Sequence, residues 1–104
     1  MTNDNDNEII KYKFYIGWNN QTHKREVKKA IRVLNDFKVL GFNINKNMLG
    51  YWDKTQENSF IIEVINTEDL NLNDNIIKDI KTQLENNLKQ FLVLTTKEKL
   101  TLIN

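Results

Sequence analysis

The residues of this chain that could do acid–base chemistry are few. The sequence holds one histidine, His23, and histidine is the usual proton carrier near neutral pH. It lies between Thr22 and Lys24 at the start of a predicted helix, where the positive helix end and the adjacent cation disfavour its charged form. No second histidine or carboxylate falls beside it at the spacing of metal ligands. We therefore expect no catalytic residue, no metal site and no cofactor, and predict that the chain is not an enzyme.

One carboxylate stands out because its neighbours are apolar. Glu63 lies in a run of isoleucines that reads as a strand, and an unpaired charge is unfavourable to bury there. We expect Lys13, on the adjacent strand, to form a cross-strand ion pair with it. A ligand-binding or catalytic role for Glu63 is the alternative. Glu57 is interpreted as a turn residue.

Large aromatic residues and two cations form the candidate binding set. Trp18 follows the first predicted strand, and Tyr51 and Trp52 end the second. Such aromatics contribute strongly at binding surfaces, although half-buried core is the alternative reading. Arg25 and Lys28 lie in the first turns of the predicted helix, and a helix start with cations attracts anions. All five are predicted to bind a ligand or partner.

The periods of hydrophobic residues predict the order β-α-β-β-α-β. The alternating pattern of residues 9–16 indicates a strand. A helix should begin after the cap Thr22 and end at Gly41, and a second should begin near Asn73. A second strand is expected at 42–52, with a bulge near Asn47. A polar connection over 53–57 leads to a third strand at 59–65, and a fourth strand is expected at 91–95. Residues 99–103 would add a fifth strand through a hairpin.

This order predicts an α+β sandwich of the ferredoxin-like type, with two helices on one face of a four-stranded antiparallel sheet. A chain of 104 residues is long enough for one core, so we expect a disordered tail at 1–7 and a single domain at 8–104. The absence of cysteine excludes disulfides and thiolate zinc sites. No signal-like or membrane-spanning run is present, and we predict a cytoplasmic protein.

Charge is distributed unevenly although the net charge is only +1. Basic residues dominate positions 24–38, and acidic residues dominate positions 53–74. Such a separation would steer an anionic partner to one side of the domain. Two solvated faces are the alternative interpretation.

The run Phe14-Tyr15-Ile16-Gly17-Trp18-Asn19 resembles the first-strand signature of RNA recognition motifs. The resemblance implies the same βαββαβ order and a base-stacking role for Tyr15. The third strand departs from that family, because Phe60 is its one aromatic and Glu63 stands where the exposed face should carry aromatics. A single-stranded RNA-binding module is therefore kept as an alternative function.

A second resemblance covers Gly50-Tyr51-Trp52 and Glu57-Asn58-Ser59-Phe60-Ile61-Ile62, which look like small ferredoxin-like proteins of phages and bacteria. Dimeric ferredoxin-like proteins pack their sheet faces together, which implies a homodimer. The predicted dimer face contains Tyr15, Leu49, Ile61 and Ile65. This face is too apolar to remain in water.

We therefore expect a binding protein encoded by a phage or mobile element, which sequesters a ligand or blocks a host defence protein. Its partners would be a second copy of the chain and either a host protein or a small anionic ligand, with no membrane. A small enzyme of the dimeric ferredoxin-like type is a further alternative.

Overall fold

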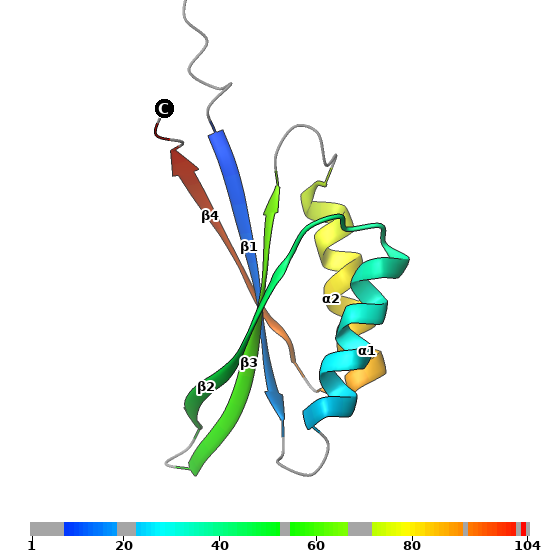
Figure 1. Cartoon of the computed structure of the whole chain (residues 1–104), viewed down its shortest axis with the longest axis vertical. Coiled ribbons are helices and arrows are strands. Elements are labelled where there is room, and N and C mark those ends of the chain that lie inside the picture. The colour runs from blue at the N-terminus through cyan, green and yellow to red at the C-terminus, as the bar shows by residue number, and fades with distance from the viewer. Residues whose placement is uncertain are drawn as a thin grey trace, which may run out of the picture.

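The computed structural model describes residues 8–18, 23–52, 55–66, 72–90, 92–101 and 103. The elements in order are β1 (Glu8–Trp18), α1 (His23–Asp36), β2 (Asn43–Trp52), β3 (Thr55–Asn66), α2 (Asp74–Leu88) and β4 (Leu94–Thr101). Both helices pack side by side on the same face of the sheet (Figure 1). The predicted β-α-β-β-α-β order is confirmed. The expected tail at 1–7 lies outside the described residues.

The four strands form one antiparallel sheet in the order β2-β3-β1-β4. The central strands pair in a register that places Tyr12 opposite Val64 and Phe14 opposite Ile62. Between Asn45 and Met48 the β2–β3 register shifts, which confirms the bulge predicted near Asn47.

The core lies between the sheet and the helices, and its members follow the sequence periods. Alternate residues of β1 and β3 point inward, and the helices contribute stripes at i, i+3 and i+4. No charged residue among the described positions is buried. The fully or nearly fully buried residues are Tyr12, Phe14, Ile16, Val27, Ala30, Val33, Leu34, Val39, Phe60, Ile62, Val64, Ile77, Ile80, Leu84, Leu88 and Val93.

Local chemistry sets the start of α2. Asn73 has extended backbone angles, and its side-chain oxygen accepts a hydrogen bond of 2.9 Å from the Ile76 backbone N–H. An N-cap of this kind satisfies a helix N–H that has no partner within the helix. The predicted start near Asn73 is confirmed.

The end of α1 differs from the prediction at Gly41. The helix ends at Asp36, and Lys38 adopts a left-handed conformation with φ 60°. The Val39 backbone N–H then donates to the Leu34 carbonyl at 3.0 Å, and the Val39 side chain is buried. The left-handed residue Lys38 thus ends the helical turn and lets the Val39 side chain enter the core, before the chain reaches Gly41.

Two strand boundaries also correct the predictions. β3 begins at Thr55, inside the segment expected as a polar connection, because Thr55, Gln56 and Glu57 pair with β2. The expected C-terminal hairpin is wrong as well. β4 is one continuous strand that pairs with β1 from Leu94 to Thr101, so residues 96–98 belong to the ladder with β1 instead of forming a turn.

Candidate functional site

One face of the sheet is left open by the helices, and a charged cluster lies on it. The Glu63 carboxylate oxygen Oε2 is 3.7 Å from the Lys13 ammonium nitrogen and 3.8 Å from that of Lys11. The predicted Lys13–Glu63 pair is confirmed, and Lys11 joins it. All three side chains are between 23% and 30% exposed, so the pairs are partly screened and contribute only about 0–1 kcal/mol each. These ion pairs place two positive side chains and one negative side chain next to each other on the open face.

Apolar residues flank the charged cluster on the same face. Tyr15 lies opposite Ile61 on β3 and opposite Leu94 on β4, and Ile65 lies opposite Lys11. Ile65 is 38% exposed and Leu94 is 54% exposed. The structure thus places three of the predicted dimer residues, Tyr15, Ile61 and Ile65, on one surface. The side chain of the fourth, Leu49, lies outside the described part.

The predicted ligand-binding residues are gathered at one end of the sheet by the backbone. Trp18 pairs with Asn58 at the end of β1, and Tyr51 and Trp52 pair with the first residues of β3. The chain passes from this end of β1 to the start of α1 (Figure 1). The side chains of Trp18, Tyr51, Trp52 and His23 lie outside the described residues.

The two cations of the predicted set are on the first half of α1. Arg25 and Lys28 are exposed, and each lies on the helix surface opposite the stripe that enters the core. They are therefore available to an anion.

One feature of the helix layer was not predicted from the sequence. A groove of about 240 Å³ lies between the helices, lined by Val33, Asp36, Phe37 and Gln83. It is smaller than a typical ligand pocket. Among the described residues, no group of three or more histidine, aspartate or glutamate residues could hold a metal ion.

Tyr12 forms a polar contact that joins three elements. Its hydroxyl donates to Asp74 Oδ1 at 2.9 Å, and Lys97 Nζ lies 3.1 Å from Asp74 Oδ2. Burial, followed by the hydrogen bond to Asp74, raises the pKa of Tyr12 to about 12. The Tyr12 hydrogen bond, followed by that from Lys97, lowers the pKa of Asp74. The phenol therefore stays protonated and holds β1 to the start of α2.

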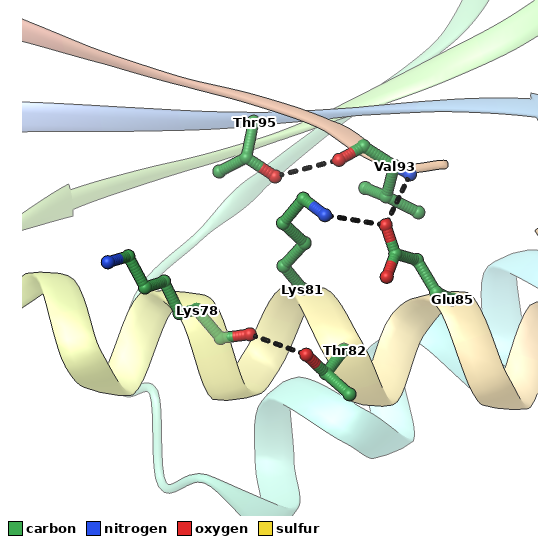
Figure 2. A network of polar contacts seen from close by, with 6 residues as sticks. All are labelled: Lys78, Lys81, Thr82, Glu85, Val93 and Thr95. Atoms are coloured by element: carbon green, nitrogen blue, oxygen red, sulfur yellow. Dashed lines mark hydrogen bonds and ion pairs between the residues drawn. The ribbon is translucent and has the colours of Figure 1, made fainter. Parts of the chain in front are cut away.

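Figure 2 shows a second contact, at the other end of α2. One carboxylate oxygen of Glu85 accepts a 2.7 Å hydrogen bond from Lys81 Nζ and a 2.9 Å hydrogen bond from the Val93 backbone N–H. The Lys81 hydrogen bond, followed by that from Val93, lowers the pKa of Glu85. Glu85 thus anchors Val93, the residue that precedes β4.

No known protein family matches the sequence, and no curated protein matches it either. Solved structures do share the fold. CPII, a nitrogen regulatory PII-like protein from Thiomonas intermedia K12 bound to ADP, AMP and bicarbonate, has a TM-score of 0.59 at 10% identity, covering 93% of this chain and 94% of that one. CutA1 from Oryza sativa has a TM-score of 0.58 at 13% identity, covering 93% and 84%. The fold is ferredoxin-like.

A third structure of the same fold is an enzyme. A phage SAM lyase in complex with S-methyl-5'-thioadenosine has a TM-score of 0.55 at 14% identity, covering 90% of both chains. This finding overturns the prediction that the chain is not an enzyme. That prediction excluded catalysis because the one histidine has no second histidine or carboxylate beside it at the spacing of metal ligands. The phage protein nevertheless has lyase activity on the same fold, and carboxylate and hydroxyl groups also serve in catalysis.

The predicted resemblance to small ferredoxin-like proteins of phages and bacteria is supported at the level of the fold. PII-like and CutA1 proteins and a phage protein all share it. Among the described residues, no helix is long and apolar enough to cross a membrane.

Proposed function

We propose that this chain binds a small molecule that contains adenosine. The observation that supports the proposal is the chemical likeness of the ligands that two structural neighbours bind. Two proteins of this fold with different names and activities hold such molecules: ADP and AMP in CPII, and S-methyl-5'-thioadenosine in the phage SAM lyase. These ligands share an adenine base and a ribose, whereas their phosphate and thioether groups differ. The shared part is therefore the part that we expect this chain to recognise.

The end of the sheet where β1 leads into α1 is the proposed site. Trp18, Tyr51 and Trp52 belong to strand segments that end there, and an aromatic ring that stacks on a base contributes about 1–3 kcal/mol. Arg25 and Lys28 are exposed on the adjoining helix and would bind phosphate oxygens where the ligand has them. This set offers both interactions that an adenine nucleotide needs.

The proposal predicts a specific order of affinities in isothermal titration calorimetry. AMP, ADP and S-methyl-5'-thioadenosine should bind, and GMP should bind at least about tenfold more weakly, which corresponds to about 1.4 kcal/mol. Replacing Arg25→Glu together with Lys28→Glu should weaken AMP but spare the uncharged S-methyl-5'-thioadenosine. The matched control, Lys78→Glu with Lys99→Glu, changes the net charge equally on exposed positions elsewhere. Equal binding of GMP, or no heat with any of the ligands, would refute the proposal.

The same samples decide between binding and turnover. The protein is incubated with S-adenosylmethionine, and released S-methyl-5'-thioadenosine is measured by chromatography. Release that depends on the protein identifies a lyase. Binding without release supports a protein that sequesters its ligand, as expected of a phage or mobile-element protein. If the chain instead blocks a host defence protein, it must bind that protein directly. Saturating the chain with the adenosine ligand would then leave the host protein bound.

We further propose that two copies of the chain pack through the open sheet face. The face carries Tyr15, Ile61 and Ile65, flanked by Leu94. Its two lysines, Lys11 and Lys13, are balanced by Glu63 and by Glu98, which lies opposite Lys11. A neutral surface with apolar residues fits a second copy of itself better than a polyanion such as RNA.

Sedimentation equilibrium at micromolar concentration tests this packing. The wild-type chain should sediment as a dimer, and Ile61→Lys with Ile65→Lys should convert it to a monomer, because each lysine would be buried without a partner. Leu40→Lys is the control, since Leu40 is 81% exposed and lies outside this face. A monomeric wild-type chain would contradict the proposed packing.

A further inference from the structure

The open face of the sheet carries rows of side chains that cross its two central strands. β1 and β3 are neighbours in the middle of the order β2-β3-β1-β4, and both helices cover the opposite face (Figure 1). In one row Lys13 lies opposite Glu63, and in the next row Tyr15 lies opposite Ile61. Each of these rows therefore joins two side chains that complement each other, one from each central strand.

The charged row has room for a further partner. Glu63 Oε2 is 3.7 Å from Lys13 Nζ and 3.8 Å from Lys11 Nζ. A charge-assisted hydrogen bond is shorter, at about 2.7–2.9 Å. Neither lysine therefore stands at hydrogen-bonding distance from this carboxylate, and an additional cation above the face would find an acceptor there.

Symmetry limits how a second copy can lie on this face. Stacked sheets keep their strand directions within about 30° of each other, so a two-fold axis between them runs nearly perpendicular or nearly parallel to the strands. Lys13 is the middle residue of β1. A perpendicular axis through the centre of the sheet would lay each strand on its own copy and bring the two Lys13 side chains together, which is unfavourable.

A parallel axis has the opposite effect on the charges. When it lies above the line between the two central strands, β1 of each copy lies on β3 of the other. Every residue then faces its own neighbour in the row, contributed by the second copy. Lys13 meets Glu63, and Tyr15 meets Ile61, so charged residues contact charged residues and apolar residues contact apolar residues.

We propose that two copies of the chain pack about this parallel axis. The proposal rests on the sheet-face dimer proposed above and adds which residues meet in it. Lys13 and Glu63 of both copies would form a ring of four alternating charges, which we call the charge ring. Charges enclosed between two sheets are tolerated when each has partners of opposite sign, and the charge ring gives each of them one within its own chain and one across the interface.

The outer strands distinguish the parallel axis from the perpendicular one. Leu94 and Asn45 belong to the row of Tyr15 and Ile61, and both are exposed. The parallel axis places β4 over β2 of the second copy, so Leu94 should face Asn45. The two Leu94 side chains would be three strand spacings apart, about 14 Å across the sheet. A perpendicular axis would instead lay β4 on β4.

Cysteine crosslinking tests the arrangement, because the chain contains no cysteine of its own. Asn45→Cys and Leu94→Cys variants are mixed and treated with a short bismaleimide, since sheets stacked about 10 Å apart hold facing residues too far apart for a disulfide. We expect a crosslinked heterodimer from the mixture and little product from either variant alone. Lys99→Cys replaces Leu94→Cys in the control, because Lys99 is exposed on β4 but pairs with Ile10, which faces the helices.

Charge reversal tests the charge ring by sedimentation equilibrium. Lys13→Glu places four carboxylates in the ring and Glu63→Lys places four ammonium groups there, so each should raise the dimer dissociation constant at least about tenfold. An equal mixture of the two variants should form a heterodimer at least about tenfold tighter than either homodimer, because opposite charges face each other again. Lys78→Glu, an equal charge change on exposed α2, should leave the dimer unchanged. Circular dichroism checks that the variants are folded.

The outcomes separate this arrangement from the dimer on which it rests. A wild-type dimer in which Leu94→Cys crosslinks to itself, or in which Lys13→Glu and Glu63→Lys weaken association no more than Lys78→Glu, would overturn the parallel axis and leave the sheet-face dimer in place. A monomeric wild-type chain would refute the dimer and the axis together.

Discussion

Phe14→Ala is expected to lower the free energy of unfolding by about 3–5 kcal/mol. Phe14 is fully buried in β1, a central strand, with Ile62 on one side and Thr95 on the other. Removing the ring leaves a cavity that two fixed strand neighbours cannot fill. A domain of this length has a total stability of about 5–15 kcal/mol, so the variant would keep only part of it.

Urea denaturation followed by circular dichroism measures this loss. Leu40→Ala provides the control, because Leu40 is 81% exposed and its truncation should change stability by no more than about 0.5 kcal/mol. A loss below about 1 kcal/mol for Phe14→Ala would show that the core is packed differently from the arrangement described above.

Glu85→Ala should have the second-largest effect, a loss of about 2–3 kcal/mol. The substitution removes the acceptor of two hydrogen bonds, from Lys81 Nζ and from the Val93 backbone N–H. Val93 itself is fully buried, so its N–H would lose a charge-assisted partner near the core. Glu85→Gln keeps an acceptor oxygen but not the charge, and we expect an intermediate loss.

The pH dependence of this loss has a definite sign. The folded-state pKa of Glu85 is lowered by Lys81 and Val93, so its ionic contribution is present above the unfolded pKa of about 4.3 and disappears as pH falls through the folded value. The difference between wild type and Glu85→Ala should therefore shrink from about pH 7 to about pH 3. Asp79→Ala, an exposed position on the same helix, is the control. An unchanged difference at both pH values would contradict the proposed role of the carboxylate.

The parts of the fold that depend on local patterns could be predicted from the sequence. Alternation fixed the inward face of β1, and the side chain of Asn73 set the start of α2. Glu63 was expected beside Lys13 because an unpaired carboxylate is unfavourable among isoleucines, and the structure places them 3.7 Å apart. Each of these features depends either on residues that are close in sequence or on the pairing of two adjacent strands.

Features that depend on distant partners could not be predicted. Residues 55–57 are polar yet form strand because β2 pairs with them, and β4 lacks alternation because its register is imposed by β1. The Tyr12–Asp74 hydrogen bond joins positions 62 residues apart.

For the candidate site, the backbone brings the expected aromatic segments to one end of the sheet. The exclusion of catalysis failed because it counted residue types and did not consider what the fold can host.

The contacts at the two ends of α2 have a consequence for aggregation. β4 is an edge strand of the sheet, and an edge strand that detaches or pairs with another molecule is a common start of misassembly. Lys97 holds β4 to Asp74 at the beginning of α2, and Glu85 holds Val93, just before β4, near its end. Separation of the strand would therefore break both contacts, which makes detachment of this largely exposed edge less favourable.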